Sequence, residues 1–298
     1  MEAGPRILVV GDVIDDVLVR PAGPIRPDTD TVATIERRPG GSAANVAAWL
    51  GFLGASVDFV GTVHASDRDR HAGLLEAVGV TTLLLPSAEP TGTIVLLLEG
   101  EVRTMLTARG ANDLTRPESV PAGLLRAAGH VHLTGYSLFA SDPQGWRRLL
   151  AGAAPATSSV DPSSTAFLEE FGVDRFLATT AGVDIAFPNL DEGRLLTGGS
   201  TPDDVAAALL EHYPVVALTL GPDGVLVRTR SGPVLRLPAV RPEGGALDPT
   251  GAGDAFAAGF LERWCAGAPL ADAATAGVTT ASRAVAMVGA RPAPAAAQ

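Results

Sequence analysis

The sequence predicts an α/β protein in which helices cover both faces of a mostly parallel central sheet, giving three layers. Short, continuous apolar runs such as 7–10 and 215–220 are typical of strands that are buried on both faces. Helical patterns alternate with these runs along the chain, which is the order that produces a parallel sheet. Alternating apolar and polar residues at 17–20 and 31–36, between Pro/Gly clusters, predict exposed strands of a second, smaller sheet.

The individual elements follow from the same signals. A glycine closes the amphipathic helix at 67–78, and a Glu-Gly-Glu turn joins the hairpin at 93–98 and 102–107. The other strands are predicted at 57–60, 130–133, 159–160, 184–187, 224–227 and 234–237. The other helices are predicted at 45–53, 143–151, 191–196, 202–212, 251–266 and 270–288.

No internal repeat and no long linker divides the chain, so we expect one domain over residues 1–298. The exposed strands, contributed by about 15–38 and 91–110, would form a lid on this domain. In open α/β sheets ligands bind beside the carboxyl ends of the strands. A lid that lies over this edge would therefore close over the ligand.

Charge and the choice of basic residue exclude several classes of protein. The formal net charge is -11, from 22 Lys+Arg against 33 Asp+Glu, which argues against a general binder of nucleic acid or anionic membrane. The basic residues are all arginine, so a Walker A lysine, a protein-kinase lysine and a Schiff base are excluded. The single cysteine, Cys265, makes no internal disulfide, and the first residues lack the charged lead of a signal peptide. We expect a cytoplasmic protein.

The stretch from Asp248 to Phe256, which reads Asp-Pro-Thr-Gly-Ala-Gly-Asp-Ala-Phe, is the most informative part of the chain. A turn of small residues here opens a buried helix, and unpaired N–H groups at a helix N-terminus bind anions. Asp254 lies in the first turn of that helix. A carboxylate beside a phosphate site repels the phosphate, so its presence indicates a general base that activates a hydroxyl. A carboxylate that only favours the helix N-terminus is the alternative.

A second glycine turn, Gly40-Gly41-Ser42-Ala43-Ala44-Asn45, opens a helix some 200 residues earlier. Together the two segments resemble the two signature motifs of the ribokinase-like (PfkB) carbohydrate kinases, and the resemblance extends over nearly the whole chain. It implies a ribokinase-like three-layer α/β/α fold with a small β-sheet lid.

The resemblance also implies roles on the nucleotide side. Asp254 would be the base, and the backbone amides of Gly251, Ala252 and Gly253 would stabilise charge on the transferred phosphoryl group. The nucleotide side would further include Asn189, Thr219, Gly221 and Gly224, with Glu192 placing Mg²⁺ through water and Asp248 helping to hold a monovalent cation such as K⁺. Without the family, Glu192 reads as a charge in the first turn of a helix and 219–224 as a plain turn.

On the acceptor side the resemblance implies sugar binding by carboxylate, amide and guanidinium groups. These residues would be Asp12, Asp16, Gly41, Asn45, Arg103 and Asn112. A solvated loop is the alternative for Asp16 and its neighbour Asp15, and a solvent-facing strand position is the alternative for Arg103.

The implied reaction is transfer of the γ-phosphate of ATP to a primary hydroxyl of a small carbohydrate, with Mg²⁺ and K⁺. A nucleoside kinase on the same fold is an alternative, for which Tyr136 and Phe139 would supply an aromatic platform. A catalytically silent sugar or nucleotide sensor is another, although the retained Asp254 argues against it. The region around Gly135 lacks the glutamate that ribokinases use on their substrate, so the acceptor stays open. Related kinases often pair through their lids, and we expect a homodimer.

Overall fold

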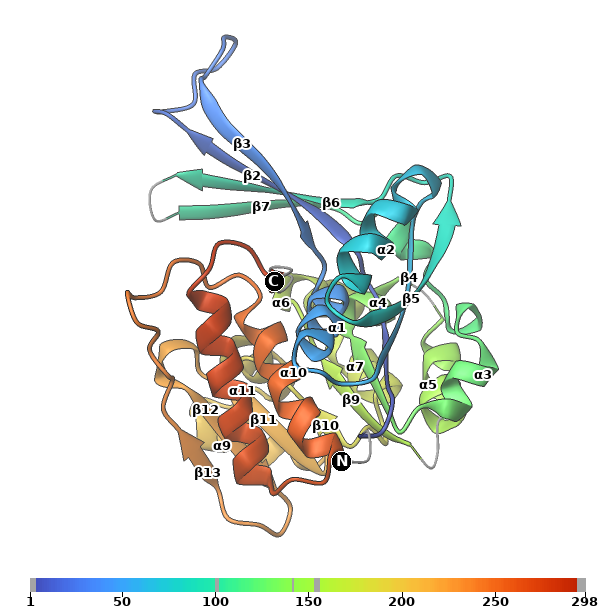
Figure 1. The fold of residues 1–298 in the computed structure, drawn as a ribbon. Helices are drawn as coiled ribbons and strands as arrows, with labels where there is room; N and C mark the ends of the chain where they lie inside the picture. Colours follow the sequence, from blue (N-terminus) through green and yellow to red (C-terminus); the bar gives the residue numbers. More distant parts are fainter. Residues whose placement is uncertain (1–3, 100–101, 141, 153–155, 294–298) are drawn as a thin grey trace.

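A central sheet runs through the body of the protein in the computed structural model, which describes residues 4–99, 102–140, 142–152 and 156–293 (Figure 1). In these residues the sheet has nine strands, in the spatial order β13 (Leu235–Leu237), β12 (Val225–Thr229), β11 (Val215–Thr219), β10 (Ile185–Ala186), β9 (Thr157–Asp161), β8 (His130–Thr134), β1 (Ile7–Val10), β4 (Val57–His64) and β5 (Val80–Ser87). The strands from β5 through β11 pair in parallel, whereas β12 and β13 are antiparallel additions at one edge. Strand order reverses at β1, which is where α/β proteins bind ligands.

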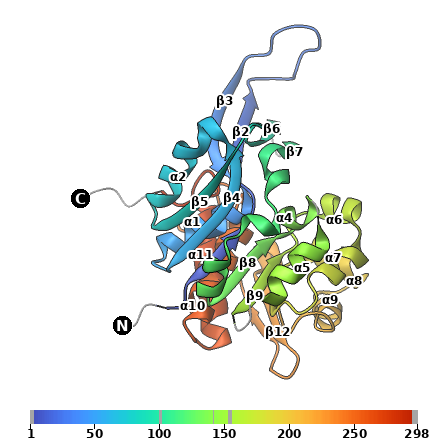
Figure 2. The same cartoon turned by 90° about the vertical axis from the view of Figure 1, so that its right-hand side faces the viewer.

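Helices cover both faces of this sheet, and Figure 2 shows the two groups on opposite sides. One face carries α1 (Ser42–Phe52), α2 (Arg68–Glu76), α10 (Ala252–Cys265) and α11 (Leu270–Val285). The other carries α3 (Ala122–Ala127), α4 (Gly135–Phe139), α5 (Pro143–Gly152), α6 (Thr165–Phe171), α7 (Val173–Thr179), α8 (Leu190–Thr197) and α9 (Pro202–Leu209). None of the described helices is long and apolar enough to cross a membrane.

Strand β1 shows how the apolar runs build two cores. Ile7 and Val9 pack into the core beneath α1 and α10, whereas Leu8 and Val10 pack into the core of the opposite layer. Because successive side chains of a strand point to opposite faces, a strand between two helical layers tends to form a continuous apolar run. The three-layer α/β/α fold predicted from these runs is confirmed.

A second, small sheet stands apart from the body (Figure 1). Its strands, in spatial order, are β3 (Ala33–Gly40), β2 (Ile14–Pro21), β6 (Gly92–Glu99) and β7 (Val102–Ala108). The register aligns Asp16, Leu18, Leu96 and Met105 on one face and places Ile35 on the other.

The structure also differs from the predictions in particular places. Strand β5 was not predicted, because Thr81 and Thr82 interrupt its apolar run; it lies at the edge of the sheet, where a partly polar strand is tolerated. Helices α6 and α7 were also missed, since each has seven residues and Gly172 separates them. Strand β2 begins three residues before the predicted start at residue 17, so that the alternative of a solvated loop for its two aspartates is wrong.

Candidate active site

A pocket of about 260 Å³ lies between the carboxyl ends of the central strands and one face of the small sheet. The residues that line it at or just after the ends of β1, β8, β9, β10 and β11 are Asp12, Tyr136, Asp161, Asn189 and Thr219. The small sheet contributes Asp16, Ile94, Leu96, Met105 and Thr107. Residues far apart in the sequence thus meet where the strand order reverses.

Asp254 is held at the floor of this pocket by the helix that the second glycine turn opens. Its Oδ1 accepts a hydrogen bond from Ser42 Oγ at 2.6 Å, and its Oδ2 accepts one from Asn45 Nδ2 at 2.9 Å. Burial raises the pKa of Asp254 to about 6, although both hydrogen bonds act to lower it. The carboxyl group is therefore mostly ionised at neutral pH and has a pKa suited to accepting a proton.

The glycine turn before Asp254 has a conformation that requires glycine. Gly251 has φ 75°, and a Cβ there would lie 2.6 Å from the Cβ of Ala290. Helix α10 starts at Ala252, and the turn residues 249–253 line the pocket, so the helix N-terminus faces it. The Ala252 N–H donates to the carbonyl of Pro249 at 3.2 Å, so this one of the three predicted amide donors has a partner within the turn.

Asp12 caps helix α1 from the end of β1. Its carboxylate accepts hydrogen bonds from the N–H groups of Ser42 (2.7 Å) and Ala43 (3.1 Å) and from Thr134 Oγ1 (3.0 Å). Gly41, at φ 95°, allows the chain to pass close to Asp12, because a Cβ there would lie 2.6 Å from the carbonyl oxygen of Asp12. These contacts place Asp12 in the pocket wall and also use most of its accepting capacity.

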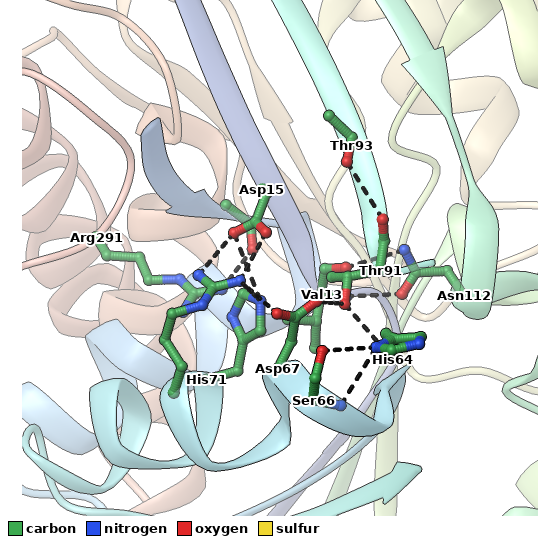
Figure 3. Close-up of polar contacts among 12 residues, drawn as sticks. Val13, Asp15, His64, Ser66, Asp67, His71, Thr91, Thr93, Asn112 and Arg291 are labelled. Carbon is green, nitrogen blue, oxygen red and sulfur yellow. Dashed lines mark hydrogen bonds and ion pairs between the residues drawn. The ribbon is translucent and has the colours of Figure 1, made fainter. Parts of the chain in front are cut away.

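Asp16 is the pocket carboxylate of the small sheet. It is buried, and burial raises its pKa to about 7, with Arg291 acting to lower the pKa and Asp12 and Asp254 acting to raise it. Its neighbour Asp15 points to the other face of β2, where it pairs with both terminal nitrogens of Arg70 on α2 at 2.7 and 2.8 Å. Figure 3 shows Asp15 close to Asp67 and His71 in this second polar cluster, which joins the small sheet to α2.

Asn189 and Glu192 form a reciprocal cap at the start of α8. The Asn189 N–H donates to Glu192 Oε2, and the Glu192 N–H donates to Asn189 Oδ1, both at 2.9 Å. Burial, helped by the nearby charge of Asp254, raises the pKa of Glu192 to about 7, although the hydrogen bonds with Asn189 act to lower it. Burial also raises the pKa of Asp161, at the end of β9, well above its usual range. A carboxylate group that burial makes hard to ionise is stabilised by a cation brought to it.

The remaining predicted residues lie in different surroundings. Thr219 lines the pocket, but Gly221 and Gly224 do not, and a Cβ at Gly224 would collide with the carbonyl of Leu237 in the neighbouring strand. Asp248 lines an adjoining hollow instead, and its carboxylate accepts hydrogen bonds from Thr250 and from the Gly289 N–H.

Asn112 and Arg103 are the two remaining residues that the sequence predicted on the acceptor side. Asn112 lines the pocket, but its amide is engaged with backbone groups, accepting from the Val13 N–H and donating to the Val13 and Arg109 carbonyls (Figure 3). Arg103 belongs to strand β7, but its side chain lies outside the described part of the structure. Arg109 is the basic residue among those that line the pocket, and its Nη2 donates to the Tyr136 carbonyl at 2.6 Å.

Comparison with known proteins decides the family. The model of the pfkB family carbohydrate kinases matches residues 5–296, which is nearly the whole chain. The chain belongs to the PfkB family of carbohydrate kinases. It is therefore a phosphotransferase with a ribokinase-like fold, as the two glycine motifs predicted.

Two curated relatives and one solved structure place this PfkB kinase among its neighbours. It is 32% identical over 276 residues to an ATP-dependent ribose-1-phosphate kinase of Halopiger xanaduensis, with 87% of this chain and 84% of the relative covered. It is 30% identical over 302 residues to the bifunctional protein HldE of Shewanella baltica, covering 95% of this chain but only 60% of that longer protein. The structure of adenosine kinase from Sinorhizobium meliloti superposes with a TM-score of 0.84 at 24% identity, covering 97% of this chain and 96% of that one, and this shows a shared fold.

Three site residues of this PfkB kinase were not identified from the sequence. Ser42 contacts Asp254, Asp161 ends β9 in the pocket wall, and Arg291 donates from its Nε to Asn45 Oδ1 at 3.0 Å. Ser42 lies within a motif that had already been recognised, and Asp161 follows a predicted strand, so both carried a signal. Arg291 stands beside a Pro/Ala-rich stretch and carried none.

Proposed function

We propose that this PfkB kinase transfers the γ-phosphate of ATP to a primary hydroxyl group of a small carbohydrate, with Asp254 as the general base. The observation that carries the proposal is the position of Asp254, whose carboxylate is fixed by Ser42 and Asn45 beside a helix N-terminus that faces the same pocket. A base and an anion site at one point are what phosphoryl transfer to a hydroxyl needs.

In this proposal the two ends of the pocket hold the two substrates. The turn from Gly251 to Gly253 and the start of α10 would bind the phosphates, with Asn189 and Thr219 on the nucleotide side. Asp16, Asn45 and the backbone around Gly41 would hold the hydroxyl groups of the acceptor. Asp254 would accept the proton of the attacking hydroxyl, which its pKa of about 6 allows at neutral pH.

The carboxylates of the pocket fit a magnesium ion that is bound mainly through water and phosphate. Glu192 and Asp161 are buried oxygen donors, and the charges that act most strongly on each belong to other carboxylates. No three ligating side chains of the described residues converge as a closed metal site. Glu192 would hold Mg²⁺ through water, and when bound the ion supplies positive charge next to the phosphates. Asp248, beside the glycine turn, would help to hold K⁺.

We further propose that the small sheet is a lid that closes the pocket from the acceptor side and excludes water. Its inner face contributes Leu96 and Met105 to the pocket wall. Its outer face exposes Ile35 and Leu106, at 64% and 60% of their surface, and such apolar positions favour pairing with a second copy. The protein would then be a cytoplasmic homodimer.

A nucleoside is the second candidate acceptor, because of the same apolar wall. Tyr136 lines the pocket together with Ile94, Leu96 and Met105, which could pack against a base, whereas Phe139 packs against other aromatic rings and does not line the pocket. Among the pocket residues whose side chains the structure describes, Arg109 is the one arginine, and this gives less support to a phosphorylated acceptor, although the Halopiger relative is named for ribose 1-phosphate.

Coupled measurement of ADP release tests the proposal. Mg²⁺, K⁺ and ATP are supplied with ribose and other free sugars, ribose 1-phosphate and other sugar phosphates, and adenosine and other nucleosides. We expect one of these classes to give ADP release that depends on the acceptor, and a free sugar to be the best. ATP binding without ADP formation for any acceptor would instead favour a silent sensor.

A further inference from the structure

The short segment after α11, Val288–Arg291, connects the two glycine motifs. The Trp49 Nε1–H of α1 donates to the Ala290 carbonyl at 2.9 Å, and the Gly289 N–H donates to Asp248 at 3.1 Å. Arg291, the last residue of this segment, contacts the glycine motif at 40–45, where it donates to Asn45 Oδ1 and to the carbonyl of Gly40. The segment therefore touches both the loop before Asp254 and the helix that holds Asp254.

The contacts of Asn45 show what Arg291 does in this arrangement. A guanidinium group can only donate hydrogen bonds, and an ionised carboxylate can only accept them. The amide of Asn45 lies between the two, with Oδ1 accepting from Arg291 at 3.0 Å and Nδ2 donating to Asp254 at 2.9 Å. Arg291 therefore fixes the amide in the one orientation that presents a donor to Asp254.

Arg291 is also a buried positive charge that interacts with several carboxylates of the pocket. Its Nη1 is enclosed and has no hydrogen-bond partner among the described residues, and burial lowers its pKa to about 10, so the group remains a cation at neutral pH. The carboxylates of Asp16, Asp12, Asp15 and Asp254 all act in the opposite direction and favour that cation. Figure 3 shows the side chain of Arg291 extending toward Asp15 and His71.

We propose that Arg291 is a positioning residue for phosphoryl transfer: it orients Asn45 toward Asp254 and supplies the cation that faces the pocket carboxylates. This inference rests on the proposed role of Asp254 as the base. Arg291 itself would touch neither substrate, since it acts through Asn45 and through its charge.

Other charged and titratable groups also face Asp254 from the surrounding elements. They are Asp12 after β1, Asp16 on β2, Tyr136 on α4, Asp161 at the end of β9 and Glu192 on α8. All five are acidic groups, whereas Arg291 is a cation that favours the ionised form of Asp254 together with the hydrogen bonds from Ser42 and Asn45. Removing Arg291 is therefore expected to raise the pH at which the base becomes ionised.

The experiment compares Arg291→Met with Asn45→Ala, with the double variant and with Arg6→Met as a control. Arg6 also pairs with a buried carboxylate, Asp58 at 2.8 Å, but precedes β1 at the opposite edge of the sheet from the pocket. In Arg291→Met we expect kcat to fall by about tenfold to a hundredfold, as for a misplaced catalytic group. The acid limb of kcat should move to higher pH, and the KM for ATP should stay within about twofold. Arg6→Met should lose stability while its acid limb stays unchanged.

The double variant tests the route through Asn45. If Arg291 acts through Asn45, Arg291→Met should lower kcat much less in the Asn45→Ala background than alone, whereas additive losses would overturn the inference. The inference would also be overturned if Arg291→Met kept the wild-type kcat and acid limb while Asp254→Asn was inactive. That result would leave the proposed function intact. Full turnover in Asp254→Asn would instead refute the proposed base. If Arg291→Met does not fold, Arg291→Gln, which keeps a donor and loses the charge, decides by whether its acid limb moves.

Discussion

Ser42 gives the sharpest test of how the site sets the acidity of Asp254, the proposed base. Its hydroxyl donates to Asp254 Oδ1 at 2.6 Å and acts to lower the pKa of that carboxyl group, which burial raises to about 6. A hydrogen bond to a charged group contributes about 1.5–3 kcal/mol, and about 1.4 kcal/mol corresponds to one pH unit. In Ser42→Ala the pKa of Asp254 should therefore rise from about 6 to between about 7 and 8.

The sign of the effect on activity follows from the role of the base. Asp254 must be ionised to accept a proton, so activity is lost as the pH falls through its pKa. At pH 7 the rate of Ser42→Ala should be about twofold to tenfold below that of the wild type, and above pH 9 the two should converge. The assay is the pH profile of kcat/KM, with Ser42→Thr, which keeps a hydroxyl, as the matched control. An acid limb in Ser42→Ala that coincides with that of the wild type would refute the reasoning.

Three further predictions concern the phosphate turn, the metal and the lid. Gly251→Ala should destabilise the protein by about 2–4 kcal/mol through left-handed backbone strain and overpacking, as measured by urea unfolding. Gly253→Ala, where a Cβ would meet no atom within 4 Å, should leave the unfolding midpoint unchanged. Equal midpoints for the two variants would contradict the packing argument. Glu192→Gln should raise the Mg²⁺ concentration needed for half-maximal rate by about tenfold or more, since loss of a residue that orients a metal's ligands typically lowers metal affinity by that factor. An unchanged Mg²⁺ titration would show that Glu192 is not part of the metal site. Light scattering should report a dimer for the wild type and a monomer for Ile35→Glu combined with Leu106→Glu, and a monomeric wild type would end the proposal of pairing through the lid.

The central sheet could be predicted where its strands form continuous apolar runs, as in β1 and β11. A run such as Ile7–Val10 packs against helices on both faces of the sheet, so that all four of its side chains are apolar, and this pattern is visible in the sequence alone. Strand β5 was not predicted because it lies at an edge of the sheet and its sequence is partly polar. Helices α6 and α7 were not predicted because each is short. Local patterns are weakest where an element covers only part of the core.

The site could be predicted as far as its residues lie in glycine turns. Asp254 and Asn45 lie at the start of the helices that such turns open. The structure brings Asn45 Nδ2 to 2.9 Å from Asp254 Oδ2, although 209 positions separate the two residues in the sequence. Asn112 and Gly224 also have backbone or packing contacts that a motif does not reveal. Arg291 could not be found in this way, since its contacts with Asn45 and Gly40 are made 246 and 251 residues away in the sequence.

The most direct test of the account is the turnover of Asp254→Asn on the best acceptor, measured beside its affinity for ATP. The substitution removes the base and keeps the size of the side chain. The account predicts that ADP formation falls by about 10²–10⁴-fold, the usual contribution of a general base, while ATP binding by calorimetry changes little. Turnover within a few-fold of the wild type would show that Asp254 is not the base and would contradict the account.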